Sequence, residues 1–171
     1  MKKLLLVVIA IVSIQFLFAQ APEVIIESGG TKILKGFVTK QALISDSAFT
    51  WFAENQKGYT PNAAALQALK INKDSLRFLV FGGTWCGDTK FVLPKFFALS
   101  DAAGVAPDRI TLIGVDRSKK TIQHLSETFN ITNVPTIIVL KDGKEIGRVV
   151  EYGISGMFDK DLGEIISRIK Q

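Results

Sequence analysis

The chain has 171 residues, a formal net charge of +5 and a single cysteine. This length is typical of one domain, and one cysteine excludes an internal disulfide. The positive excess is mild and contains no dense block of lysine and arginine, so we expect no nucleic acid partner and no membrane contact beyond the N-terminal segment.

The first residues have the pattern of a secretory signal peptide. A short basic start, "MKK", precedes the uncharged apolar run "LLLVVIAIVSIQFLFA". This run is shorter than the roughly 20 residues that span a bilayer, which favours a cleaved leader over a retained membrane anchor. We therefore predict a signal peptide over residues 1–19, cleaved after Ala19, and export to the periplasm or secretion.

Residues 20–74 are predicted to form an N-terminal extension that supplies the first strand and helices of the domain. The segment "TKILKGFVT" (31–39) is expected as an edge strand, and "SDSAFTWFAENQKGY" (45–59) as a helix. The aromatic residues of that helix are expected in the core rather than in a binding groove: Phe49, Trp51 and Phe52.

A second helix of the extension is predicted over "TPNAAALQALK" (60–70). Thr60 is the expected N-cap, and Pro61 occupies the first helical position, where its missing N–H costs nothing.

Residues 75–171 have the pattern of an alternating α/β core. "SLRFLVF" (75–81) and "RITLIGVD" (109–116) are apolar runs typical of strands covered on both faces. The remaining elements are helices over 90–104, 121–130 and 158–170, and a hairpin of 136–140 with 145–151 that turns at Asp142-Gly143. Alternation predicts parallel strands with helices on both faces of one sheet, and the hairpin adds antiparallel strands.

Several short motifs of the core resemble those of the thioredoxin-like superfamily, in order and in spacing. They are Trp85-Cys86-Gly87, Pro94, Val134-Pro135-Thr136, Asp142-Gly143 and Gly153. The resemblance covers roughly residues 75 to 170 and implies a thioredoxin-like fold: a central mixed sheet with helices on both faces, here with an N-terminal helical extension. It also implies a cis peptide bond before Pro135, and a client-binding groove made by Trp85, Gly87, Val134 and Pro135 beside Cys86.

Three positions depart from the family pattern: Asp88, Thr89 and Val80. The family motif Cys-Gly-Pro-Cys is Cys86-Gly87-Asp88-Thr89 here, so a hydroxyl stands where the second thiol is expected. The buried acid that assists that second thiol in the family corresponds to Val80. The second thiol and the acid that assists it are both absent. These two changes agree with each other, because without the thiol the acid has nothing to deprotonate.

Cys86 is the candidate nucleophile. It is expected at the N-terminus of a helix, where unpaired backbone N–H groups and the positive helix end favour the reactive thiolate. Thr89 lies three residues further on, where its hydroxyl could hydrogen-bond the sulfur, so both residues are assigned to the catalytic site.

A single sulfur can attack a disulfide but cannot resolve the mixed disulfide internally. The sequence therefore predicts monothiol–disulfide exchange on protein or small-molecule thiols and disulfides, of the isomerase, reductase or de-capping type. Two alternatives stay open: a non-catalytic client-binding module, and a thiol peroxidase that reacts through a sulfenic acid. One cysteine and one histidine give no metal-ligand spacing, so no metal or other cofactor is expected. The sequence does not indicate an oligomeric state.

Overall fold

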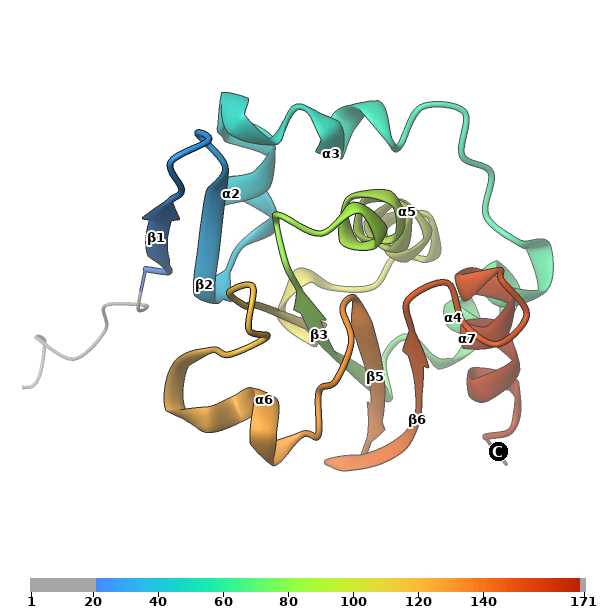
Figure 1. The fold of residues 1–171 in the computed structure, drawn as a ribbon. Helices are drawn as coiled ribbons and strands as arrows, with labels where there is room; N and C mark the ends of the chain where they lie inside the picture. Colours follow the sequence, from blue (N-terminus) through green and yellow to red (C-terminus); the bar gives the residue numbers. More distant parts are fainter. Residues whose placement is uncertain (1–20, 170–171) are drawn as a thin grey trace, which may run out of the picture.

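The computed structural model describes residues 21–169, which form one six-stranded mixed sheet with helices on both faces (Figure 1). The strands are β1 (Glu23–Ile26), β2 (Lys32–Val38), β3 (Leu76–Gly82), β4 (Ile110–Gly114), β5 (Thr136–Lys141) and β6 (Lys144–Val150). The α-helices are α2 (Lys40–Ser45), α3 (Trp51–Glu54), α4 (Ala63–Asn72), α5 (Gly87–Ala103), α6 (Leu125–Thr128) and α7 (Phe158–Ser167). Short 3-10 turns occur at η2 (Ser47–Phe49), η3 (Pro107–Arg109) and η4 (Ile122–His124). The predicted fold class, α/β with a thioredoxin-like mixed sheet, is confirmed.

The strand order is β1-β2-β4-β3-β5-β6, and only β3 and β4 run parallel. Two expectations about the first strand are wrong. The strand predicted over 31–39 is not at the edge, because β1 pairs with it as an antiparallel hairpin. This strand, β2, also runs antiparallel to β4, whereas parallel strands were expected. The chain leaves β2 and enters β3 at the same end of the sheet, so the helices between these two strands do not form a crossover connection.

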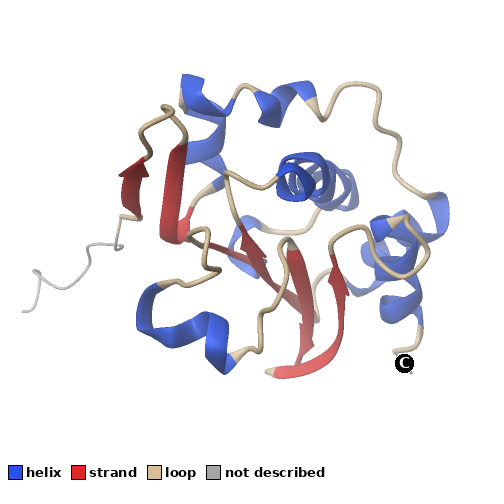
Figure 2. Cartoon of the chain, in the orientation of Figure 1, coloured by secondary structure: helices blue, strands red, loops and turns tan. Residues whose placement is uncertain are grey.

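The central strands are apolar on both sides because each face of the sheet carries its own core. On one face α3, α4, α5 and α7 cover the sheet, and Phe78, Val80 and Phe96 are buried there. Helix α6 lies on the other face of the sheet (Figure 2), where a smaller cluster contains Phe81 and Ile113. Trp85 and Cys86 pack at the margin of the smaller cluster, so the candidate site belongs to the α6 side of the sheet.

The helix predicted over 45–59 is broken at its start. Asp46 is extended, and its carboxylate accepts the N–H of Ala48 at 2.9 Å. An aspartate that satisfies a nearby backbone N–H competes with helix propagation, and the segment becomes η2 followed by α3. Phe49 and Phe52 are buried and Trp51 packs against them, so the expectation that these aromatics belong to the core is confirmed.

Helix α4 begins later than predicted. Its N-cap is Asn62, whose side chain accepts the N–H of Ala65 at 3.1 Å. Thr60 is therefore not the cap, and Pro61 precedes the helix. Asparagine caps a helix better than threonine, which explains the shift.

The rest of the core follows the predicted order. Helix α5 continues through Pro94 and ends at Gly104, a left-handed residue at the C-cap. Asp142 and Gly143 both have positive φ, as the two-residue turn between β5 and β6 requires.

The predicted signal peptide, residues 1–19, lies outside the described residues. Between residues 21 and 169, none of the helices combines the length and the apolar character that crossing a membrane would require.

Candidate functional site

The site begins where β3 ends and α5 starts. Cys86 is the N-cap of α5 with an extended backbone, and its N–H donates to the carbonyl of Gly83 at 2.8 Å. The predicted place of the cysteine, at a helix start after a buried strand, is confirmed. Cys86 is half-buried, and its place at the N-cap puts it next to the first N–H groups of the helix, which have no partner within the helix.

The segment before β5 lies directly against the sulfur. The Cys86 thiol donates to the carbonyl oxygen of Val134 with an Sγ–O distance of 3.3 Å, and the peptide bond between Val134 and Pro135 is cis. Val134 and Pro135 are both buried. Among the described residues the N–H of Val134 has no hydrogen-bond acceptor, while the carbonyl of Pro135 accepts the N–H of Glu151 at 2.7 Å.

Trp85 is held in a fixed orientation beside the cysteine. Its indole N–H donates to the carbonyl of Val115 at 3.1 Å. The indole lies against Gly83, where a Cβ would come within 2.7 Å of the ring. The guanidinium of Arg117 lies 5.3 Å from the ring centroid and is paired with Glu27.

Thr89 is placed differently from the expectation. It is fully buried, and its hydroxyl accepts the N–H of Gly83 at 3.2 Å. Within residues 21–169 its hydroxyl forms no hydrogen bond with Cys86. Its methyl group fills the space over Gly82. Thr89 therefore stabilises the turn that carries Cys86. The expected hydrogen bond between its hydroxyl and the sulfur is not formed.

Gly87 and Val80 differ in exposure, one lying at the surface and the other buried. Gly87 is exposed at the first position of α5, and a Cβ there would meet no atom within 4 Å. The approach to Cys86 is therefore open on this side. Val80 is fully buried between Leu112 and Ile137 on the neighbouring strands, so an apolar side chain occupies the interior position beneath the site.

One contact near Cys86 was not predicted from the sequence. The hydroxyl of Tyr152, in the loop after β6, donates to Asp88 Oδ1 at 2.9 Å. The ring of Tyr152 packs on Phe91 of α5, with centroids 5.5 Å apart. Asp88 was visible as an acidic residue of the first helical turn, but no motif marks Tyr152.

The pKa of Tyr152 indicates which groups share this neighbourhood. It is raised chiefly by the hydrogen bond to Asp88, then by burial, and then by the charges of Asp88, Cys86 and Glu151. A raised pKa keeps the phenol protonated, so it remains a hydrogen-bond donor to the carboxylate.

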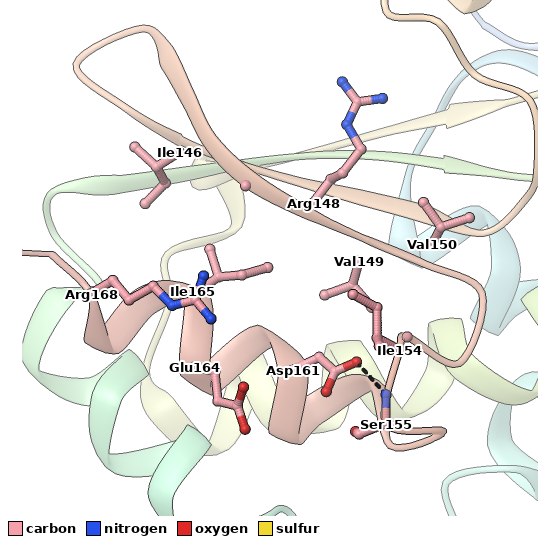
Figure 3. A pocket seen from close by; sticks show the side chains of 12 residues that line it. Ile146, Arg148, Val149, Val150, Ile154, Ser155, Asp161, Glu164, Ile165 and Arg168 are labelled. Carbon is pink, nitrogen blue, oxygen red and sulfur yellow. Dashed lines mark hydrogen bonds between the residues drawn. The ribbon is translucent and has the colours of Figure 1, made fainter.

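Other chemistry-bearing residues lie apart from Cys86. His124 is 88% exposed on η4 and contacts Glu127, and in residues 21–169 no group of three potential metal ligands occurs. A groove of about 610 Å³ lies between β6 and α7 (Figure 3). Its lining includes Ile146, Ile154 and Ile165 but none of Trp85, Cys86, Val134 and Pro135, so this groove is distinct from the thiol site.

The chain is similar in sequence to known thioredoxins. The family model described as thioredoxin matches residues 62–161, more than half of the chain. A thioredoxin of Echinococcus granulosus is 34% identical over 54% of this chain and 80% of its own length. A thioredoxin of Chlamydia muridarum is 36% identical over 52% of this chain and 76% of its own.

The fold has a solved counterpart as well. The crystal structure of an HIV epitope scaffold superposes with a TM-score of 0.57 at 16% identity, covering 78% of this chain and 94% of the other. At this identity the likeness concerns the fold alone.

Proposed function

The chain belongs to the thioredoxin family, whose chemistry is thiol–disulfide exchange, and from that membership we propose that it performs this exchange through a single sulfur, that of Cys86. The observation that carries the proposal is the placement of the only cysteine. Its half-buried thiol lies at the start of α5, against Val134, with Thr89 at the position of the second thiol.

The reaction has two steps with no net oxidation. The Cys86 thiolate attacks one sulfur of a client disulfide, so that a Cys86–client disulfide forms and the other client sulfur leaves with the electron pair and takes up a proton from solvent. An external thiolate then attacks the client sulfur of that adduct. A new disulfide forms between the client and the external thiol, and Cys86 is released as thiolate.

The backbone beside the sulfur supports binding of an extended client. The N–H of Val134 has no acceptor within residues 21–169, and its carbonyl oxygen is engaged only by the thiol of Cys86. Pairing with main-chain groups gives affinity with little sequence preference. We assign protein disulfides, including those capped by a small thiol, as the substrates.

The test uses a peptide whose cysteine carries glutathione as a disulfide. Reduced protein should take up one adduct at Cys86, seen by intact mass, and a small thiol such as mercaptoethanol should return the free protein. Complete reduction of insulin disulfides without an added thiol would contradict the monothiol reaction.

The same assay separates the two alternatives. A thiol peroxidase would instead consume hydrogen peroxide rapidly and form a sulfenic acid at Cys86, trapped by dimedone. A binding module would hold the peptide equally well after Cys86 is alkylated.

We also propose that the protein is exported, as the basic and apolar start of the sequence indicates. N-terminal sequencing of the protein from its native host should find a chain that begins near Gln20. A chain that retains Met1 and fractionates with the cytoplasm would contradict export.

A further inference from the structure

Asp88 and Tyr152 form a fixed pair at the mouth of the thiol site. Asp88 is two residues from Cys86 in the first turn of α5, and Tyr152 reaches it from the loop between β6 and α7. The ring contact between Tyr152 and Phe91 holds the phenol in place. One carboxylate oxygen, Oδ1, accepts the phenol, and Oδ2 accepts no hydrogen bond from the described part of the chain.

The carboxylate of Asp88 lies at the positive end of α5, but no side-chain cation of the described residues holds it in a salt bridge. Of the nearby charged groups, Arg117 is bound by Glu27, and Glu151 accepts the side-chain amide of Asn133. Lys90, four residues after Cys86 on α5, is half-buried and is the cation nearest in sequence.

A reaction that uses one sulfur needs an external thiol to approach this mouth. Gly87 has open space around it, so a small thiol can pass over it toward the adduct on Cys86. We propose that Asp88, held by Tyr152, selects this resolving thiol by charge and favours small thiols that carry a cationic group over those that carry a carboxylate. The proposal rests on the monothiol exchange proposed above.

The expected effect follows from Coulomb's law. A unit charge a few ångströms away in a water-like medium changes a rate a few-fold, and an aminothiol and a carboxythiol differ by two unit charges. We expect about a tenfold difference between their rates, falling as salt screens the carboxylate. The hydrogen bond from Tyr152 increases this rate difference. It keeps the Asp88 carboxylate next to the path of the incoming thiol, whereas a freely rotating carboxylate would spend part of the time turned away into solvent.

The experiment starts from wild-type protein that carries a neutral 2-hydroxyethyl disulfide on Cys86. Three thiols remove the adduct in separate reactions: cysteamine, 1-thioglycerol and 3-mercaptopropionate. Acid-quenched samples are read by intact mass. Each rate constant is expressed per thiolate and divided by that of the same thiol with bis(2-hydroxyethyl) disulfide, so that both the acidity and the intrinsic nucleophilicity of the thiol cancel. The variants are Asp88→Asn and Tyr152→Phe, and Asp142→Asn in the turn between β5 and β6 is the matched loss of an exposed carboxylate.

The wild type should react in the order cysteamine, thioglycerol, mercaptopropionate. Asp88→Asn should bring the three rates within about twofold, Tyr152→Phe should give an intermediate ratio, and Asp142→Asn should leave the wild-type ratio. Equal rates in the wild type, or an unchanged ratio in either Asp88→Asn or Tyr152→Phe, would overturn the selection while leaving monothiol exchange intact. Failure of all three thiols to remove the adduct would overturn both proposals.

Discussion

The thiol of Cys86 donates a hydrogen bond to the carbonyl oxygen of Val134, at 3.3 Å and across 48 positions of the sequence. This contact joins the start of α5 to the segment before β5. Formation of a mixed disulfide removes the thiol proton, so the carbonyl loses its donor. We expect a client N–H to replace it, while the N–H of Val134, which has no acceptor within residues 21–169, pairs with a client carbonyl. Covalent capture and main-chain pairing are then coupled.

Cys86→Ser should abolish covalent adducts without loss of stability. Cys86 is the N-cap of α5 but makes no side-chain capping bond, and serine is among the preferred N-cap residues. We expect the free energy of unfolding to stay equal to the wild type or to rise by up to about 1 kcal/mol. Urea unfolding gives the stability, and non-reducing gels with intact mass give the adducts.

Cys86→Ala is the matched control, because alanine also removes the sulfur but caps poorly. It should lose adducts equally while being less stable than Cys86→Ser by about 1 kcal/mol. If both variants retain the wild-type set of clients at the same strength, binding does not depend on the sulfur, and the binding-module alternative explains the site better.

Thr89→Cys should create a dithiol site. Residues three apart on a helix have Cβ atoms about 5–6 Å apart, and a small backbone adjustment brings such a pair within bonding range. We expect oxidised protein to contain a bond between positions 86 and 89 and to reduce insulin with a dithiol reductant faster than the wild type. Loss of the hydroxyl that accepts the Gly83 N–H should lower stability of the reduced form by about 1–2 kcal/mol.

Thr89→Ser separates the two effects of Thr89→Cys, which are the gain of a second thiol and the loss of the threonine side chain. It keeps an acceptor for Gly83 but removes the methyl group over Gly82, and it supplies no thiol. Activity as high as that of Thr89→Cys would show that a second sulfur is not what limits insulin reduction.

The thiol site was predictable because its residues form motifs with fixed spacing. Trp85, Cys86 and Gly87 follow an apolar strand, and Val134-Pro135 precedes another, so topology alone brings them together at one end of the sheet. The order of the core strands and helices followed from periodicity and from the Asp142-Gly143 turn in the same way.

The features that the sequence did not predict depend on side-chain competition and on long-range pairing. Thr89 had two possible partners, the sulfur and the Gly83 N–H, and only the packed structure decides between them. The pairing of β1 with β2 and the contact between Tyr152 and Asp88 join segments that carry no motif. Thr60 and Asn62 are both compatible with a helix start, and the cap is Asn62, the stronger capping residue of the two.

Gly83→Ala should impair the client groove through Trp85. A Cβ at this position would lie 2.7 Å from the indole, so the ring must move, which weakens its hydrogen bond to Val115. We expect a loss of about 1–3 kcal/mol in stability and slower adduct formation with the glutathione-capped peptide. Tryptophan fluorescence reports the ring movement.

Gly29→Ala is the control for Gly83→Ala, because no atom lies within 4 Å of a Cβ built there. It should match the wild type in stability, fluorescence and adduct rate. Normal adduct formation by a Gly83→Ala protein with displaced tryptophan fluorescence would remove Trp85 from the groove.

Tyr59→Phe tests how the segment before α4 is joined to α7. The Tyr59 hydroxyl donates to Asp159 Oδ2 of α7 at 2.8 Å, and the N–H of Asn62 donates to the same oxygen at 2.9 Å. Burial, and then the hydrogen bond to Asp159, raise the pKa of Tyr59 far above its ordinary value. At neutral pH the variant should be less stable by about 1.5–3 kcal/mol, the range for hydrogen bonds to charged groups.

The same pair predicts the direction of the pH dependence. A folded-state pKa that is raised above the unfolded value of about 10 gives a stabilisation that is complete below pH 10 and declines as the pH rises above it, because only the unfolded tyrosine then loses its proton. Urea midpoints of the wild type and Tyr59→Phe at pH 7, 9, 10 and 11 should therefore differ by a constant amount up to pH 9 and converge above pH 10. Tyr152→Phe, whose hydroxyl bonds the more exposed Asp88, should show a smaller difference at neutral pH. A gap between wild type and Tyr59→Phe that widens above pH 10 would show that the phenol does not act as the buried donor that fixes the segment before α4 to α7.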